Sequence, residues 1–296
     1  FYSYIHELCS KAVPAGSHLS RKSAVGLLVL TGIIWSTGGF LIKMIPWPPL
    51  VIAGLRSGIT AIVIYLYDRP SKLPTGKYTL GGAVSYAVMV IFFVVANKLT
   101  TAGNTILIQY TAPVYVALVG YSFLGEKVYL RDWITIGIIL SGLCLFFLDD
   151  LSGTSLWGNV AAVLSGFGFA GLILFLRKQK HGRPIDSVLL GNLLTFLICT
   201  PMIHQDVTFE TFAWLRILFL GIIQLGLAYI LFTIAIKHVT ALDAVVYPVV
   251  EPIFNPFFAY LFLEETLGFY SKVGGFLVLA GVIGRGIAQT VQTNKQ

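Results

Sequence analysis

Few residues in this sequence can do chemistry inside an apolar environment, and one carboxylate stands out among them. Glu251 lies ten residues into an apolar segment that begins near Ala241. An ionised carboxylate at that depth in a membrane is costly, and such residues usually have a function. Burial disfavours the charged form, which suits a group that takes up and releases a proton or binds a cation. The alternative is a neutral glutamic acid that packs by hydrogen bonding to a neighbouring helix.

Polar side chains recur every four residues around Glu251. They form one face of a predicted helix, because positions four apart lie close together on a helix surface. Three prolines in the same segment each remove an amide donor and free the carbonyl four residues earlier. We expect this face to line a cavity, and a proline-kinked packing helix is the alternative. Asp243 should lie near the cytoplasmic end of the face, where water reaches it. The face consists of Asp243, Tyr247, Glu251 and Asn255.

An earlier apolar segment carries counterpart residues, Gln109 and Tyr110. Pro113 frees the carbonyl of Gln109, so we expect that acceptor beside the Tyr110 hydroxyl. A single tyrosine in a span serves either a site or packing, and both interpretations stay open for Tyr110.

Further polar or aromatic residues lie within other apolar segments. Arg56 is about seven residues into its segment, roughly 10 Å along a helix axis. It either anchors a substrate carboxylate, pairs with an acid, or hydrogen-bonds carbonyl groups of a neighbour. Trp35 lies outside the interfacial belt where tryptophan is enriched, so it is a candidate cavity residue. Gln224 and Tyr229 complete the candidate substrate-binding or proton-coupling set, whereas Arg285 is expected to extend toward the cytoplasmic surface.

The elements that position these residues follow from composition. Hydrophobic residues make up 56% of the 296 positions and charged residues 11%, with a mean hydropathy of +0.84. A soluble domain has about 45–50% apolar and about 25% charged residues, so that class is excluded. The apolar segments are too long and too continuous for barrel strands. We predict an all-α integral membrane protein whose ten transmembrane helices lie near 24–45, 49–67, 78–96, 101–123, 131–148, 155–176, 185–203, 211–236, 241–263 and 269–289.

Other function classes lose support. The sequence has no HExxH, GxSxG or phosphate-binding loop, and its three cysteines are far apart. We expect no catalytic residue, no metal site and no cofactor, and therefore no enzyme. The net charge of +7 is attributed to membrane orientation and not to nucleic acid. Fourteen Lys and Arg residues fall on the N-terminal side and four on the other, so both termini should be cytoplasmic in a cell (plasma) membrane.

An internal repeat predicts the architecture. Residues 96–126 align without a gap on 235–265 at a constant offset of 139, with identities such as Pro113 with Pro252 and Glu126 with Glu265. Each unit holds five spans, an odd number, so the second copy should be inverted in the membrane. Inverted five-helix repeats with a site at their interface are a recurring plan of secondary transporters.

The same residues resemble a known family. A Trp/Gly-rich first helix (35–39), a helix carrying Arg56, and the Ala-x-Lys…Thr-Ala…Pro…Leu-x-Glu stretch are similar to the EamA-type branch of the drug/metabolite transporter superfamily. The second half departs from the first where Glu251 stands against Ala112. The resemblance covers about 23–290 and implies a ten-helix carrier of small metabolites. It divides the chain into an N-terminal tail (1–22), repeats at 23–150 and 151–290, and a C-terminal tail (291–296); within the first tail, Gly16-Ser17-His18 resembles a tag-cleavage remnant.

Together these observations predict a secondary active transporter of small organic metabolites that works by alternating access. Amino acids, amines or aromatic metabolites suit a cavity that offers a carboxylate, an arginine and aromatic rings, and Glu251 is the proton-coupling candidate. A passive facilitator of the same fold, in which Glu251 only binds substrate, is the alternative. The expected partners are the small-molecule substrate, the lipid bilayer and protons, with the chain as a monomer or homodimer.

The charge asymmetry makes a direct prediction about topology. Single cysteines introduced at Asp149 or Asp150 should react with an impermeant thiol reagent in intact cells, because that loop should face outward. Cysteines at Lys178 or Lys180 should not react until the cells are opened. Labelling of the 177–183 loop in intact cells would reverse the predicted orientation.

Overall fold

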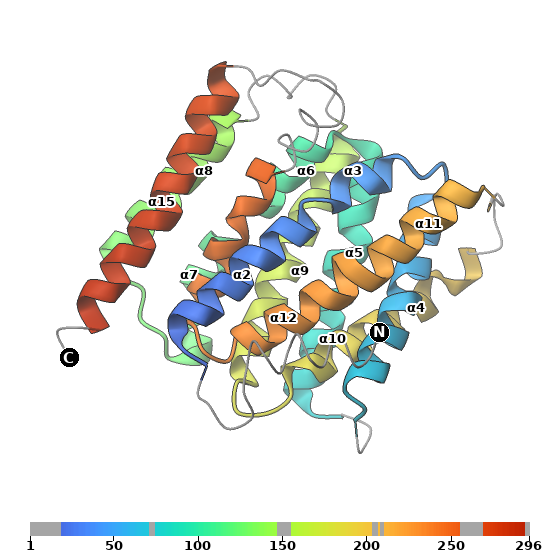
Figure 1. Ribbon diagram of the computed structural model, residues 1–296, viewed down its shortest axis with the longest axis horizontal. Helices are drawn as coiled ribbons and strands as arrows, with labels where there is room; N and C mark the ends of the chain where they lie inside the picture. Colours follow the sequence, from blue (N-terminus) through green and yellow to red (C-terminus); the bar gives the residue numbers. More distant parts are fainter. Residues whose placement is uncertain are drawn as a thin grey trace.

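The computed structural model describes residues 19–70, 75–146, 155–202, 207, 210–254 and 269–293. Within these ranges every regular element is a helix (Figure 1). Seven helical segments there are long and apolar enough to cross a membrane, and the predicted all-helical membrane fold is confirmed.

The first half contains α2 (Arg21–Trp35), α3 (Gly38–Lys43), α4 (Pro49–Tyr67), α5 (Lys77–Leu99), α6 (Ala102–Gln109), α7 (Ala112–Leu124) and α8 (Leu130–Phe146). The second half contains α9 (Leu156–Lys178), α10 (Pro184–Cys199), η2 (Thr200–Met202), α11 (Thr211–Phe219), η3 (Leu220–Leu227), α12 (Ala228–Ala235), α13 (Ala241–Val246), η4 (Tyr247–Val250) and α15 (Phe269–Thr293).

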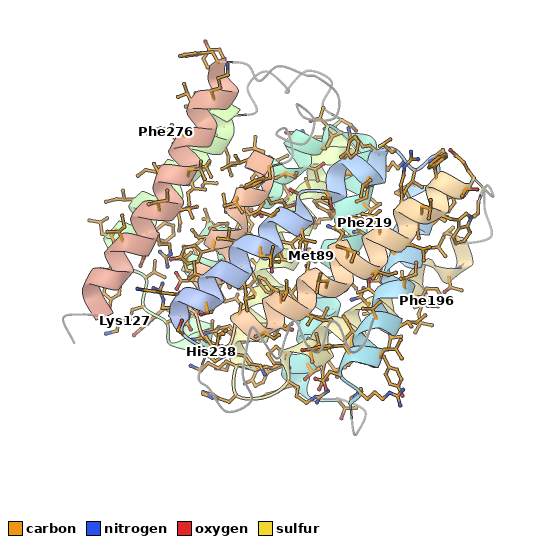
Figure 2. All side chains as sticks on the ribbon, viewed as in Figure 1. Met89, Lys127, Phe196, Phe219, His238 and Phe276 are labelled. Carbon is orange, nitrogen blue, oxygen red and sulfur yellow. The ribbon has the colours of Figure 1, made fainter. Side chains whose placement is uncertain are left out.

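The helices agree with the predicted segments to within a few residues. The second part of the ninth segment, 255–263, lies outside the described residues, and so does the predicted outward-facing pair at 149–150. Large apolar side chains cover the outside of the bundle, as a lipid-facing surface requires. Phe276 is 71% exposed, and Figure 2 shows it pointing away from the bundle.

Repeat-related segments run in opposite directions through the bundle. The Ala241 amide, at the start of α13, donates to Glu126 Oε2 at 2.7 Å, just beyond the C-terminal end of α7. Arg177 Nε, at the end of α9, donates to the other oxygen of the same carboxylate at 2.6 Å. The start of α13 therefore lies beside the end of α7, so residues 102–124 and 241–254 are antiparallel. This is the inverted arrangement that the repeat predicts.

Hydrogen bonds between helix ends also show which basic residues lie at the same end of the bundle. We call the end that holds Arg21, Glu126 and Arg177 the basic end. At the opposite end, Lys98 Nζ donates to the Ile45 carbonyl at 2.5 Å, and Arg216 Nη1 donates to the Met44 carbonyl at 3.0 Å. Lys98 and Arg216 thus share one end, as the charge pattern predicts.

Helix α9 lies inside the bundle against α5, and glycine permits the close approach. A methyl group added at Gly168 would lie 2.6 Å from the backbone nitrogen of Met89, inside any tolerable contact. Small residues serve this purpose in membrane helices because they let backbones come together. The contact fixes Met89 and the neighbouring part of α5 at the level of the cavity described below.

A buried ion-pair cluster joins four helices at the basic end. Arg285 of α15 is 4% exposed and donates from Nη1 to Asp132 Oδ1 at 2.6 Å and from Nε to Asp243 Oδ1 at 2.8 Å. Arg21 Nη2 donates to Asp243 Oδ2 at 3.0 Å. Two expectations from the sequence were wrong here. Arg285 does not extend to the surface, and Asp243 is fully buried, because each finds an opposite charge on another helix.

The cluster also explains how α8 and α15 stay attached. These two helices pack along each other as a pair at one side of the bundle (Figure 1). Arg285, which also pairs with Asp132, joins this helix pair to Asp243 of α13, and Asp243 in turn pairs with Arg21 of α2. Charges buried in this way are costly singly and stable only when matched.

We therefore expect Arg285→Met to destabilise the protein by about 3–5 kcal/mol, because it leaves buried carboxylates without their shared cation. Arg183→Met is the matched control. Arg183 is also ion-paired, to Asp68 and Asp186, but its side chain is 42% exposed, so its loss should cost about 1 kcal/mol or less. Thermal unfolding of the purified variants in detergent measures both. Equal losses of stability in the two variants would show that the buried cluster stabilises the fold no more than an exposed ion pair does.

Candidate functional site

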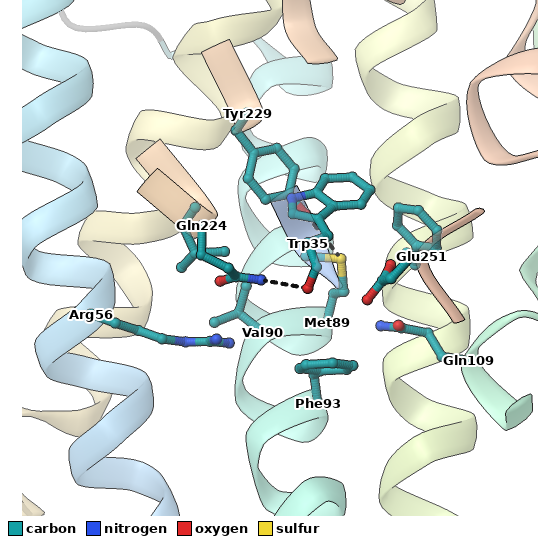
Figure 3. Close-up of a pocket in the computed structure, with 11 residues that line it drawn as sticks. Trp35, Arg56, Met89, Val90, Phe93, Gln109, Gln224, Tyr229 and Glu251 are labelled. Atoms are coloured by element: carbon teal, nitrogen blue, oxygen red, sulfur yellow. Dashed lines mark hydrogen bonds between the residues drawn. The ribbon is translucent and has the colours of Figure 1, made fainter. Parts of the chain in front are cut away.

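A cavity lies in the interior where several helices depart from regular geometry. The space not filled by protein atoms there is about 390 Å³, a volume that includes open solvent. Figure 3 shows its walls, with Arg56 and Gln224 on one side and Glu251 and Gln109 on the other. The lining residues comprise six of the nine candidates from the sequence, namely Trp35, Arg56, Gln109, Gln224, Tyr229 and Glu251, together with Met89, Val90, Phe93, Phe169 and Leu225.

The ninth segment changes from α-helix to a 3-10 turn just before Glu251. The turn covers Tyr247–Val250, and Pro252 removes the amide that would bond the Pro248 carbonyl. The Tyr110 hydroxyl lies 2.9 Å from the Pro248 carbonyl oxygen and 2.8 Å from Glu251 Oε2. Tyr110 itself stands where the fourth segment breaks, between α6 and α7. Two broken helices from the two halves of the chain thus meet at one buried hydroxyl group.

The protons at this contact can be counted. A tyrosine hydroxyl carries one proton and also accepts, whereas the Pro248 carbonyl oxygen can only accept. Both short contacts are full hydrogen bonds when Tyr110 donates to Pro248 and a protonated Glu251 donates to Tyr110. If Glu251 is ionised, the single tyrosine proton serves only one of the two contacts, while the Pro248 carbonyl keeps the bond that it accepts from the Glu251 backbone amide. The arrangement therefore fits the neutral form of Glu251.

The Tyr110 contact corrects one expectation. The sequence predicted the Gln109 carbonyl as the acceptor near this hydroxyl, but the hydroxyl points across the bundle to Pro248. Gln109 instead directs its side chain to α9, where Nε2 lies 2.7 Å from Ser165 Oγ, and Ser165 donates to the Met89 carbonyl at 3.0 Å.

The first helix is interrupted at the same cavity. It breaks between Trp35 and Gly38, and Gln224 Nε2 is 3.5 Å from the Trp35 carbonyl oxygen. Gln224 lies in η3, a π-helical stretch, which is a form of helix often found at functional sites. Gly38 packs directly against this side chain, because a methyl group there would be 2.6 Å from Gln224 Nε2.

Aromatic rings form one side of the cavity around Trp35. Its ring centroid lies 5.1 Å from that of Tyr229, 5.4 Å from Phe232 and 5.9 Å from Phe169. The tilted and edge-on geometries are those favoured by ring quadrupoles. Trp35 is 5% exposed, and its indole nitrogen has no hydrogen-bond partner among the described residues.

Arg56 enters the cavity from α4 and is 1% exposed. Its Nε and Nη1 atoms have no hydrogen-bond partner in the described part of the chain, and neither does Gln224 Oε1. Buried polar groups are nearly always paired, so unpaired groups facing a cavity are candidates for contact with a polar ligand.

The other three sequence candidates are Tyr110, which contacts Glu251 as described above, Tyr247 and Asn255. Tyr247 does not line the cavity and is directed toward α15, where a methyl group on Gly286 would be 3.8 Å from its hydroxyl. Asn255 lies outside the described residues. The lining residues that sequence reasoning missed are apolar, and within spans of the same composition they carry no signal that separates lining from packing.

Comparison with known proteins supports the same architecture. The sequence profile described as the EamA-like transporter family matches residues 22–148 and 156–285. The chain is 24% identical over 257 residues to an uncharacterized transporter of Archaeoglobus fulgidus, covering 86% of this chain and 93% of the relative. It is 27% identical over 158 residues to the uncharacterized inner membrane transporter YedA of Escherichia coli, covering 49% and 50%. A solved crystal structure superposes with a TM-score of 0.76 at 19% identity, covering 92% of this chain and 99% of that one.

The packing of Gly32 against the backbone of Pro248 gives a test of the cavity geometry, because a methyl group at Gly32 would be 2.7 Å from the Pro248 carbonyl oxygen. We expect Gly32→Ala to lower stability by about 1–3 kcal/mol, because the new methyl group must push the backbone of the ninth segment away. Gly26→Ala on the same segment is the control, since a methyl group there meets nothing within 4 Å. That control should be neutral or slightly stabilising. Thermal unfolding of both variants measures the difference, and a Gly32→Ala variant as stable as the wild type would contradict the tight packing.

Proposed function

Because the chain belongs to the EamA-like transporter family and is a membrane transporter, not an enzyme, we propose that it is a secondary active transporter. It moves small organic metabolites by alternating access, and Glu251 couples their movement to protons. Amino acids, amines and aromatic metabolites match the chemistry of the cavity, which combines one carboxylate, one guanidinium group and aromatic rings.

The observation that carries proton coupling is the contact of Tyr110 with both Pro248 and Glu251. Protonation of Glu251 makes both contacts of Tyr110 hydrogen bonds, whereas deprotonation leaves one proton for the two contacts. The Pro248 carbonyl also accepts a bond from the Glu251 backbone amide, so what changes is the bonding between Tyr110 and these two groups. Loading and release of a proton therefore change the bond that joins the two broken segments beside the cavity.

A passive facilitator of the same fold is the second candidate. In that case Glu251 binds substrate without a proton cycle, and a pH gradient does not drive accumulation. The residues that line the cavity are compatible with both candidates. The contact of the Tyr110 hydroxyl with both Pro248 and Glu251 favours proton coupling over passive transport.

The same proposal includes location and orientation. The chain is a multi-pass membrane protein, and we place it in the plasma membrane with both termini in the cytoplasm. The inner-membrane relative and the gathering of basic residues at the end where α2 begins support this placement.

Glu251→Gln tests proton coupling because it keeps the size of the side chain and removes its titration. A thermal-shift screen against a metabolite library first identifies a ligand, and flux is then measured in proteoliposomes. If Glu251 carries the proton, the variant should lose uptake driven by a pH gradient while exchange of substrate persists in part.

Other outcomes separate the alternatives. If Glu251 binds a cationic group, ligand affinity itself should fall by roughly 1–3 kcal/mol. If gradient-driven flux and exchange both survive, Glu251 only packs and the assignment fails. Glu210→Gln is the matched control, because Glu210 is an exposed carboxylate at the N-cap of α11, and it should change neither activity.

A further inference from the structure

Two arginines are buried in this protein, and they differ in what surrounds them. Arg285 is matched by two carboxylates at the basic end. Arg56 is even less exposed, at 1%, yet it forms no ion pair with any residue that the structure describes. Two of its nitrogen atoms have no hydrogen-bond partner there. A buried guanidinium group stays charged, and burying that charge without an anion beside it is strongly unfavourable in free energy.

No side chain of the cavity supplies that anion. Glu251 is the one carboxylate among the lining residues, and Figure 3 shows it on the opposite wall from Arg56. Its Oε2 is already in contact with Tyr110, in an arrangement that fits the neutral acid. The cavity thus holds one uncompensated positive charge.

We propose that Arg56 is the binding site for the carboxylate group of the transported substrate, so that the substrate class is small monocarboxylates with an apolar or aromatic body. This inference rests on the proposed function of the cavity as the transport site. A carboxylate fits along an edge of the planar guanidinium group and accepts two hydrogen bonds from it. Gln224 and the Trp35 indole nitrogen lie on the same cavity and offer further polar contacts.

The remaining walls select against other charged ligands. Arg56 is the single cation among the described lining residues, so it balances one negative charge and not the two of a phosphate monoester. It repels an amine that has no carboxylate, so of the substrate classes proposed above it favours amino acids and aromatic acids over amines. Met89, Val90, Phe93 and Phe169 give the rest of the ligand an apolar surface, which favours a hydrocarbon or aromatic body over a sugar.

Equilibrium binding to the purified wild-type protein tests this class directly. Benzoate, phenylacetate and hexanoate are the carboxylate probes, and benzamide and benzylamine are the neutral and cationic counterparts, all at constant ionic strength. The carboxylates should raise the melting temperature with saturation, because ligands that bind the native state stabilise it. Benzamide and benzylamine should bind at least about tenfold more weakly. Equal binding of benzamide, or no binding of any carboxylate, overturns the proposal.

Substitution of the arginine gives an independent readout. Arg56→Met should abolish the effect of the carboxylates, and Arg56→Lys, which keeps the charge but loses the planar edge, should weaken it. Without ligand, Arg56→Met should melt at the same temperature as the wild type or higher, because an unmatched buried charge is gone. Arg216→Gln is the control for removing a cation at the bundle end and should leave binding unchanged.

The two arginines also give opposite predictions, which separates a binding role from a structural one. If Arg56→Met does not fold, or loses as much stability as Arg285→Met, Arg56 is structural and the proposal fails. Carboxylate binding that persists in Arg56→Met would also contradict the proposal. Binding at equilibrium needs no proton gradient, so carboxylate binding with no coupled flux would refute proton coupling while leaving the Arg56 site intact.

Discussion

Every polar group inside an apolar bundle needs a partner, and the cavity region is built around that constraint. A regular helix meets it internally, but a broken helix exposes carbonyl groups that lipid cannot satisfy. Each break at the cavity is therefore met by a side chain from another helix. Tyr110 reaches the Pro248 carbonyl in the ninth segment, and Gln224 reaches the Trp35 carbonyl in the first. The irregular backbone and the functional side chains occupy the same place because each makes the other possible.

The same constraint distinguishes a structural charge from a functional one. At the basic end, Asp132, Asp243 and Arg285 satisfy one another and join the α8–α15 pair to α13. In the cavity, Arg56 is left unmatched. A protein tolerates such a cost where a ligand compensates it during function. The two arginines occupy similar depths of burial, so the neighbours and not the burial decide the role.

Much of the fold and part of the site were predictable from the sequence. The ten apolar segments, the inverted repeat and the freed Pro248 carbonyl depend on local features: hydropathy, a constant offset of 139 and the missing amide of proline. Pairing across the bundle was not predictable. Asp132 and Arg285 are 153 positions apart, and nothing in either segment marks the other as its partner. Met89 and Phe93 were missed because a lining residue and a packing residue have the same apolar character.

The repeat makes the central contact asymmetric, and that asymmetry matters for a transport cycle. At the offset of 139, Pro113 corresponds to Pro252, so both copies break at the same level, but Ala112 corresponds to Glu251. One half therefore supplies a hydroxyl group, and the other supplies a carbonyl and a carboxyl group. In the proposed cycle the two halves move against each other, and the Tyr110 contact is the bond that such movement must strain. A neutral Glu251 keeps this contact fully bonded, whereas an ionised one leaves it short of a proton, so the proton favours one arrangement of the halves over the other.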